Sequence, residues 1–289
     1  MEPPVPLALA QAVPRLPRGT RGTWWYEPKF DGHRAALFRT AETVRLQARS
    51  GRDITSPWMD IALAGMALRA GTVLDGEAVI WREGKLDFAA VQARAASGID
   101  RSRALAARLP ASYAVWDVLA HPDYGDVRAR RYTDRRQLLL DLLAEIGPPI
   151  QAVPATGDYE TALVWYDALR AQGIEGIVCK RAASVYRAGR IWQKVRHAET
   201  SEAVVVGYTG AAAQPRTLAV QLADGRTVLT QRLPAALARD AAAYLTATSP
   251  GPPAATTAGD TYTTTTADLV IEVLEGTTRH QVVTATRVR

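Results

Sequence analysis

The sequence predicts an α+β fold built from two domains, and three observations lead to this prediction. Short apolar runs bounded by turn residues dominate the first two hundred positions, as expected for strands. Stretches with apolar residues at helical spacing lie between those runs, which is typical of mixed sheets and helices. Near residue 200 the pattern changes to alternation like that of half-buried strands. We therefore predict one domain over residues 1–199 and a second over residues 200–289.

The first domain is expected to contain most of the strands and three helices. Its predicted strands are residues 24–26, 34–39, 44–48, 71–81, 112–119 and 176–180. Its predicted helices are residues 88–96, 134–146 and 158–172. Thr133 has the side chain of an N-cap for the second of these helices. Gly147 and Gly173 follow the second and third helices, where helix ends favour glycine.

The second domain is predicted to be a small barrel. Its expected strands are residues 203–208, 217–222, 227–233 and 269–274, with one helix near residues 234–244. Asp224-Gly225 between two of these strands is typical of a hairpin turn. About five strands plus a helix form an OB-fold. Residues 246–267 are rich in Thr, Ala, Pro and Gly, so we expect a mobile loop there.

Charge and cysteine content narrow the class of protein. Lys and Arg outnumber Asp and Glu by 35 to 29, giving a net charge of +6 and a pI of about 9.6. This balance favours a polyanionic partner, although charge alone does not establish nucleic-acid binding. Cys179 is the single cysteine, which excludes an internal disulfide and a cysteine-rich zinc site. Without a signal peptide or a long apolar run, the chain is expected to be cytoplasmic and to have no membrane partner.

One short motif carries several groups suited to phosphate chemistry. Lys29 follows a predicted strand, with Asp31, Gly32 and Arg34 close behind it. Gly32 allows a close backbone approach to a ligand, and Arg34 offers a planar guanidinium for phosphate or ribose oxygens. Taken alone, this pattern also fits an ordinary charged turn.

Further polar residues interrupt apolar strands elsewhere in the first domain. Glu77 breaks one buried run, and Trp116-Asp117 ends another. Residues 175–180 place Glu175 and Lys180 around a third apolar run. Lys194 and Arg196 stand at alternate positions, so their side chains face the same side of a strand. Each has a structural alternative, but together they indicate one site.

This ordered set resembles the covalent nucleotidyltransferases, and among them the bacterial ATP-dependent DNA ligases. Residues 29–34 match the family's K-x-D-G-x-R element, and residues 192–196 are similar to its W-x-K-x-K element with Arg196 in place of the last Lys. Arg49-Ser50-Gly51 is similar to the S-R-x-G element, with Ala48 where the family usually has Ser. The resemblance implies an ATP-grasp-like nucleotidyltransferase domain followed by an OB-fold domain. It also implies a DNA ligase that seals the 5′-phosphate of a break to the 3′-hydroxyl.

The resemblance also implies a role for each site residue. Lys29 would be the nucleophile that accepts AMP from ATP, assisted by Lys194 and Arg196. An amine attacks phosphorus only when neutral, so we expect burial and neighbouring cations to favour the uncharged form. The other implied contacts are Lys180, Lys194 and Arg196 at the phosphates, Glu27 and Trp116 at the adenine, Arg34 and Glu77 at the ribose, Arg34 and Arg49 at the DNA phosphate, and Glu175 with Asp117 at Mg²⁺ or Mn²⁺.

Two other classes of function fit the same residues. One is an RNA ligase or an mRNA-capping guanylyltransferase, which shares the Lys29 element. The other is a non-catalytic module that binds DNA breaks. We do not expect an NAD-dependent ligase, because the sequence has a single cysteine and a short segment before Lys29. The expected partners are nicked or broken double-stranded DNA and repair proteins that supply other activities, and we expect a nucleoid-associated monomer.

The C-terminal match is weaker. Ligases usually end in an Arg-containing element followed by Asp-Lys, and here only Arg279 and Arg287 resemble it. We therefore expect slow self-adenylylation with ATP.

Overall fold

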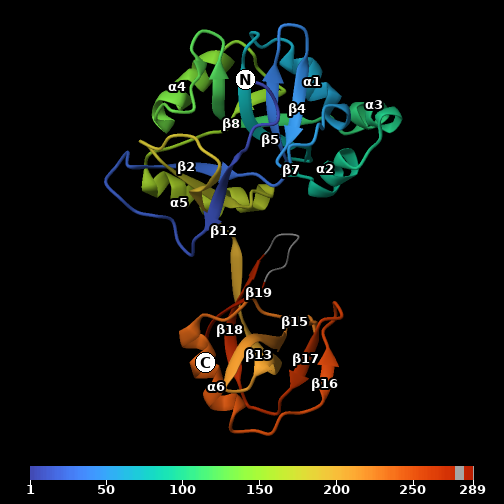
Figure 1. Ribbon diagram of the computed structural model, residues 1–289, viewed down its shortest axis with the longest axis vertical. Coiled ribbons are helices and arrows are strands. Elements are labelled where there is room, and N and C mark those ends of the chain that lie inside the picture. The colour runs from blue at the N-terminus through green and yellow to red at the C-terminus, as the bar shows by residue number, and fades with distance from the viewer. Residues whose placement is uncertain (277–282, 289) are drawn as a thin grey trace. The chain divides into compact units, whose positions relative to one another are not determined.

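A computed structural model describes residues 1–276 and 283–288 of the chain. The chain forms two compact units, Met1–Arg196 and His197–Arg289, which are drawn in Figure 1. Each unit has its own strands and helices. The α+β composition predicted from the sequence is confirmed.

The first sheet of the first unit has the order β1-β12-β11-β2. Its strands are β1 (Ala8–Ala12), β2 (Trp24–Lys29), β11 (Gly176–Arg181) and β12 (Gly189–Arg196). β11 pairs antiparallel with both β2 and β12, and β1 adds parallel to β12. Helix α5 (Tyr159–Ala168) begins after its N-cap Asp158, whose side chain accepts a hydrogen bond from Thr161 N at 2.9 Å. The 3₁₀ turn η2 (Leu169–Gln172) comes directly after α5.

The second sheet has the order β10-β8-β5-β3-β4, with β9 paired to β8. Its strands are β3 (His33–Arg39), β4 (Val44–Ala48), β5 (Val73–Val79), β8 (Ser112–His121), β9 (Gly125–Asp126) and β10 (Ile150–Ala152). The accompanying elements are η1 (Ser56–Trp58), α1 (Met59–Gly65), the hairpin β6 (Trp81–Arg82) and β7 (Lys85–Leu86), α2 (Phe88–Ala95), α3 (Ile99–Arg108) and α4 (Tyr132–Leu143). Figure 1 shows these helices beside the sheet.

The two sheets face each other across a shared core. Alternate residues of a strand point to opposite faces, and the packing follows that rule. On the second sheet, Leu37 and Leu74 pack towards the helices, whereas Phe38 and Val79 join a cluster with Trp192 of β12. The outer face of the first sheet is covered separately by a cluster that includes α5. Polar residues in phase with Phe38, Val79 and Trp192 therefore lie between the sheets.

The second unit is a closed barrel. Its elements are β13 (Ala198–Ala211), β14 (Gln214–Gln221), β15 (Thr227–Leu229), α6 (Ala235–Leu245), β16 (Pro253–Ala255), β17 (Thr261–Thr264), β18 (Val270–Gly276) and β19 (Val283–Val288). The ladder runs β19-β18-β13-β14-β15, and Thr230 beyond β15 bridges back to Val283 of β19. Leu237 and Leu245 of α6 pack into the barrel core. Five strands closed in this way, plus a helix, form the predicted OB-fold.

Two local predictions were wrong. Thr133 does not cap α4, because the helix begins at Tyr132, two residues before the predicted start, and Arg131 occupies the cap position without a side-chain hydrogen bond. Residues 246–267 are not a loop without regular structure, because β16 and β17 form a hairpin there. β1, α1 and α3 were not predicted. The resembling C-terminal residue Arg279 lies outside the described residues.

Within the described ranges, no helix is long and apolar enough to cross a membrane.

Candidate active site

Strand register brings the predicted nucleophile beside the predicted cations. Gly176 of β11 pairs with Lys29 on one side and with Arg196 on the other. Two residues further along β11, Val178 pairs with Glu27 and with Lys194. Because strands lie about 4.8 Å apart and alternate residues share a face, these side chains occupy one patch of the first sheet.

Glu175 joins the two sides of this patch. Its Oε2 forms an ion pair with Lys29 Nζ, and its Oε1 lies 2.7 Å from Arg196 Nε. The Glu175 amide also donates to the Lys29 carbonyl at 2.8 Å. The Glu175 side chain is 4% exposed, whereas those of Lys29 and Arg196 are 18% and 33% exposed. A buried carboxylate thus holds two cations at a partly open edge.

Gly176 is required by the close packing of these strands. Its φ of +147° is rare for residues with a side chain. A Cβ there would also lie 2.0 Å from the Val195 carbonyl oxygen and 2.8 Å from Arg196 Cα. Glycine therefore allows β12 to approach at the level of Lys29 and Arg196.

Lys194 lies in a crowded positive environment. Burial and the charges of Arg196, Lys29 and Arg49 lower the pKa of Lys194 to about 8, against the opposing effect of Glu175. Arg49 follows β4 and is exposed, yet it is close enough to act on Lys194. Lys194, the three cations that act on it and the Glu175 carboxylate therefore share this region. The excess of positive charge favours a polyanionic ligand such as a nucleoside triphosphate.

Glu77 faces this group from the second sheet. Burial raises the pKa of Glu77 to about 7, although Lys29 and Arg34 act in the opposite direction. Gly32 N donates to Glu77 Oε1 at 2.9 Å. Gly32 is needed there because a Cβ would lie 2.4 Å from the Ala78 carbonyl oxygen.

Arg34 is held by an acid that the sequence analysis did not single out. Its Nε and Nη2 donate to the two oxygens of Asp75, each at 2.6 Å. The guanidinium carbon lies 4.6 Å from the centre of the Trp116 ring. Asp75 and Glu77 are two residues apart on one strand, and this spacing was the sequence signal that both face the same side.

Glu27 and Lys180 form a buried pair close to Trp116. Lys180 Nζ lies 2.9 Å from Glu27 Oε2 and donates to the Trp116 carbonyl at 3.1 Å. The Tyr132 hydroxyl donates to Glu27 Oε1 at 2.5 Å. Burial lowers the pKa of Lys180, although Glu27 favours its charged form. Tyr132 was not predicted as part of the site, and its position at a helix start gave no signal for it.

Asp117 makes its contacts elsewhere. Its two oxygens accept from Arg135 Nε at 2.7 Å and Nη2 at 2.9 Å, and both side chains are fully buried. The carboxylate is thus committed to an ion pair with α4, while Glu175 is the acid that contacts Lys29. We refer below to Glu27, Lys29, Lys180, Glu175, Lys194 and Arg196 of the first-sheet side, with Arg34, Glu77 and Trp116 of the second, as the inter-sheet site.

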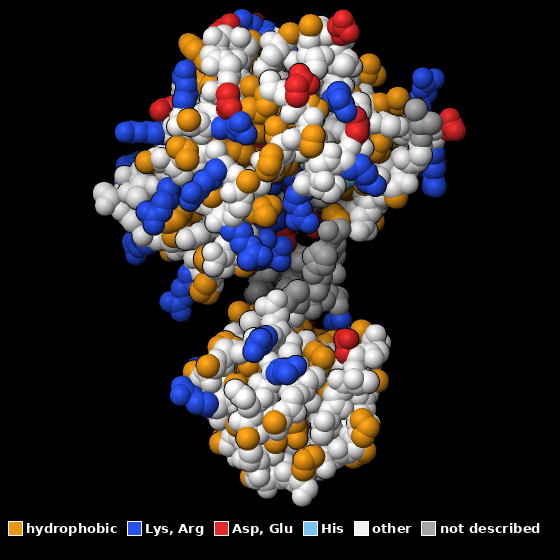
Figure 2. Space-filling model, in the orientation of Figure 1, with side chains coloured by type: hydrophobic (Ala, Val, Ile, Leu, Met, Phe, Trp, Pro, Cys, Tyr) orange, Lys and Arg blue, Asp and Glu red, His pale blue; other side chains and the backbone are white. Residues whose placement is uncertain are grey.

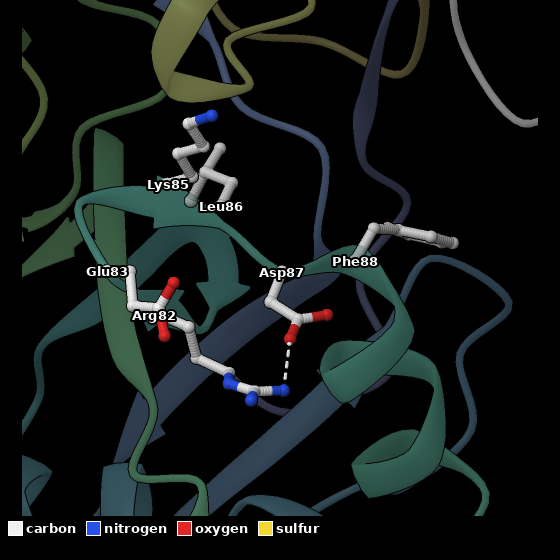
Figure 3. Close-up of a pocket in the computed structure, with 6 residues that line it drawn as sticks. All are labelled: Arg82, Glu83, Lys85, Leu86, Asp87 and Phe88. Atoms are coloured by element: carbon white, nitrogen blue, oxygen red, sulfur yellow. Dashed lines mark hydrogen bonds and ion pairs between the residues drawn. The ribbon is translucent and has the colours of Figure 1, made fainter.

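A separate pocket of about 290 Å³ lies at the β6–β7 hairpin and the start of α2. Figure 3 shows its lining residues. Among them, Arg82 Nη1 donates a hydrogen bond to Asp87 Oδ2 at 2.9 Å. Asp87 is also the N-cap of α2. None of the predicted site residues lines this pocket.

The surface of the first unit is rich in cations. Figure 2 shows Lys and Arg side chains spread over one face of this unit, with Asp and Glu side chains more sparsely placed. This distribution agrees with the positive net charge and suits a polyanion.

Two facing sheets around a lysine, followed by a closed five-stranded barrel, define a nucleotidyltransferase domain with an OB-fold. Residues 8–196 match the family described as the ATP dependent DNA ligase domain. The chain belongs to the ATP-dependent DNA ligase family, as the resemblance implied.

The relatives include two mycobacterial proteins. DNA ligase C2 of Mycolicibacterium smegmatis is 35% identical over 208 residues, which are 71% of this chain and 57% of that protein. DNA ligase C of Mycobacterium tuberculosis is 35% identical over 212 residues, covering 71% and 58% of the two chains. The matched region therefore spans less than two thirds of either relative.

Solved structures share the predicted fold. The crystal structure of the ligase domain of M. tuberculosis LigD has a TM-score of 0.56 at 25% identity, covering 98% of this chain and 95% of that one. A Lig E DNA ligase structure has a TM-score of 0.61 at 19% identity, covering 99% of both chains. The predicted nucleotidyltransferase and OB-fold architecture is confirmed.

Proposed function

We propose that this chain is an ATP-dependent DNA ligase that carries AMP on Lys29. The observation that supports this most strongly is that the strand register brings Lys29 beside Lys194 and Arg196, with Glu175 in contact with both Lys29 and Arg196. A partly exposed amine in such a cationic patch suits attack on a nucleotide phosphate. The family match supports ATP as the donor.

The proposed reaction has three steps, each of which is an attack on a phosphorus atom. The Lys29 amine attacks the α-phosphorus of ATP, an N–P bond forms, the bond to the β-phosphate breaks, and pyrophosphate and a proton leave. An oxygen of the 5′-phosphate of the DNA break then attacks the same phosphorus, a P–O–P bond forms, the N–P bond breaks, and the Lys29 nitrogen takes up a proton. Finally the 3′-hydroxyl attacks the DNA phosphate, the P–O–P bond to AMP breaks, and the phosphodiester forms with release of AMP and a proton.

The surrounding residues stabilise the charge that develops in these steps. Lys194 and Arg196 lie beside Lys29 and would meet the phosphoryl oxygens. Lys180 is fully buried and forms an ion pair with Glu27. It would therefore orient the Glu27 carboxylate towards the adenine and would affect the phosphates only indirectly. Arg49 is exposed near Lys194 and would bind the DNA 5′-phosphate.

The nucleoside is assigned to the buried end of the inter-sheet site. Glu27 is the proposed adenine contact, Trp116 is the proposed stacking ring, and Glu77 and Arg34 are the proposed ribose contacts. Arg34 is partly exposed above Trp116, which leaves part of its guanidinium for ligand.

A Mg²⁺ or Mn²⁺ ion would be held mainly through the phosphates of ATP. Among the described residues there is no group of three His, Cys, Asp or Glu side chains that could hold a metal ion. Mg²⁺ commonly uses one or two carboxylates together with substrate phosphates and water, so Glu175 alone fits. Asp117 is a weaker candidate because both of its oxygens bind Arg135. The ion would offset phosphate charge.

Charging with labelled nucleotide tests the proposal. Incubation with labelled ATP and Mg²⁺ should give a labelled protein, and Lys29→Ala should abolish the label. Lys85→Ala is the matched control, because Lys85 is an exposed lysine on the β6–β7 hairpin, away from the inter-sheet site. Label retained in Lys29→Ala would exclude Lys29 as the acceptor.

The substrates of the same assay separate the alternatives. Sealing of a nicked DNA duplex supports the proposed ligase, whereas sealing of nicked RNA alone would make it an RNA ligase. Labelling by GTP instead of ATP would indicate a guanylyltransferase. Binding of nicked DNA without any labelling would indicate a non-catalytic module. Partner repair proteins and a preference for nicks or double-strand ends are further proposals that rest on sealing.

A further inference from the structure

A closed ring of hydrogen bonds surrounds Arg34. Its Nη2 donates to Asp75 Oδ2 at 2.6 Å and to the Ala8 carbonyl at 3.1 Å. The Tyr186 hydroxyl donates to Asp75 Oδ2 at 2.7 Å and accepts from Ala8 N at 3.0 Å. The ring therefore runs Arg34–Asp75–Tyr186–Ala8 and returns to Arg34. It joins the first strand, the second sheet and the segment before β12.

Burial and packing hold Tyr186 in place within this ring of hydrogen bonds. It is 5% exposed, and its ring packs edge-on against Trp192 with centroids 5.9 Å apart. Burial, with Asp75 nearby, raises the pKa of Tyr186 well above its usual range, so the hydroxyl keeps its proton and donates. A hydrogen bond from a hydroxyl to a carboxylate is stronger than one between two neutral groups.

The ring fixes which part of Arg34 is left for a ligand. The hydrogen bonds found for Arg34 among the described residues use Nε and Nη2. The guanidinium carbon lies over the Trp116 ring, and the side chain is 17% exposed. Nη1 makes none of these hydrogen bonds and is therefore the nitrogen that can donate to a ligand. Without a fixed Asp75, a long arginine side chain has several other rotamers.

We propose that Tyr186 is a positioning residue, which holds the Asp75 carboxylate so that Arg34 is pre-oriented for the nucleotide. β1 completes the arrangement through the Ala8 amide and carbonyl. This inference rests on the proposed function of Arg34 at the nucleotide. It assigns to Tyr186 and to the first strand a part in ATP binding that acts through Asp75 and Arg34.

The test is a double-mutant cycle on nucleotide binding. The probe is α,β-methylene ATP, which cannot be cleaved at the bond that charging breaks, and its Kd is measured by calorimetry on the full chain. Tyr186→Phe removes the hydroxyl and keeps the ring. It should weaken binding about tenfold, the effect expected for one lost hydrogen bond to a charged group. In an Arg34→Lys background the same change should alter Kd by less than about twofold.

Tyr26→Phe is the matched control. Tyr26 is also buried and its hydroxyl donates to the Pro17 carbonyl at 2.7 Å, but it packs on the outer face of the first sheet. This variant should bind the probe as the parent does. If Tyr186 had only a structural role, Tyr186→Phe and Tyr26→Phe would lower the melting temperature to a similar extent. Tyr186→Phe would then also change the Kd of the probe by the same factor in the parent and in the Arg34→Lys background. That additivity, or unchanged binding in Tyr186→Phe, would overturn the inference.

Two provisions keep the outcomes distinct. If Tyr186→Phe does not fold, Asp75→Asn breaks the ring at its next link, and unchanged probe binding by that variant would overturn the inference as well. Charging is measured separately with ATP. A parent chain that binds the probe but never forms AMP-protein contradicts the proposed function, whereas a charging parent with no effect of Tyr186→Phe contradicts only the role of Tyr186.

Discussion

At the scale of single residues, two titrating side chains give the inter-sheet site its character. Glu77 is an acid whose pKa is raised to about 7, and Lys194 is a base whose pKa is lowered to about 8. Burial is the largest cause in each case, since it penalises the charged form. Shifts of this size are typical of functional sites. Both residues therefore change protonation near neutral pH.

Glu77 should make stability depend on pH. Because its pKa of about 7 in the folded chain lies above the ordinary value of 4.5, the folded state binds the proton more tightly, so stability is lost as pH rises from about 4.5 to 7. Glu77→Gln cannot ionise and should remove this loss. We expect the variant and the parent to melt alike near pH 5 and the variant to melt several degrees higher at pH 8. Parallel pH curves for the two proteins would contradict the burial of this carboxyl.

Lys194 should shape the alkaline limb of charging. It is cationic below its pKa of about 8, so its attraction for phosphate is lost as pH rises above that value. The pH profile of kcat/KM reports groups of the free enzyme. Relative to Lys194→Arg, which stays charged, the parent should lose kcat/KM above about pH 8. A constant ratio between the two proteins across this range would show that Lys194 does not act as a phosphate-binding cation.

At the scale of elements, the register of three strands assembles the site. β2, β11 and β12 place Lys29 and Arg196 on either side of Gly176. Glu175 directly precedes β11 and can therefore reach both. The catalytic geometry depends on how closely β12 approaches β11 at this level.

Gly176→Ala should disrupt that approach. The added Cβ would collide with the Val195 carbonyl, so we expect a loss of at least about 2 kcal/mol in the free energy of unfolding together with loss of charging. Gly189→Ala is the control, since Gly189 also has a positive φ, of 95°, but open space around its Cβ position. It should lose about 1 kcal/mol from backbone strain alone and keep its charging activity. Equal effects of the two substitutions would contradict a packing role for Gly176.

The sequence predicted elements well where the apolar pattern was strong. The central strands of both sheets and the hairpin at Asp224-Gly225 needed only alternation and turn residues. β1 was missed because parallel pairing to β12 stabilises a short segment with little pattern of its own. The hairpin of β16 and β17 was missed because its Thr-, Ala- and Pro-rich residues resemble a linker, while pairing with β13 orders them.

The site was predictable only in part. The spacing of Lys29, Glu77, Glu175 and Lys194 indicated the groups that meet there. Which acid pairs with which base was not in the sequence, because pairing depends on the register between distant strands. Asp75 with Arg34, and Asp117 with Arg135, are therefore known only from the structure. The roles assigned to these residues at nucleotide, metal and DNA stay predictions.

At the scale of the whole molecule, the two units have separate cores. The clusters around Leu37, Trp192 and Tyr26 lie entirely within Met1–Arg196. The barrel cluster around Leu218 lies entirely within His197–Arg289. Each core is formed without residues of the other unit, so each unit can unfold as a cooperative body. The division into residues 1–199 and 200–289 was based on the change of apolar pattern near residue 200, and its exact boundary stays a prediction.

Calorimetry should therefore resolve two transitions. Leu37→Ala and Leu218→Ala are matched probes, because both side chains are fully buried and each leaves a cavity costing about 2–5 kcal/mol. Leu37→Ala should lower one transition and leave the other in place, and Leu218→Ala should do the reverse. A single transition lowered equally by both substitutions would show that the chain unfolds as one body.

The most direct test of the central claim is to locate the AMP and to follow it into DNA. The chain is charged with ATP, freed of nucleotide, and digested for mass spectrometry, while a second portion is mixed with nicked duplex without added ATP. We expect one AMP on the peptide that contains Lys29, and sealing of an amount of DNA that does not exceed the charged protein. AMP found on another residue, or charged protein that leaves the nick unsealed, would contradict the account.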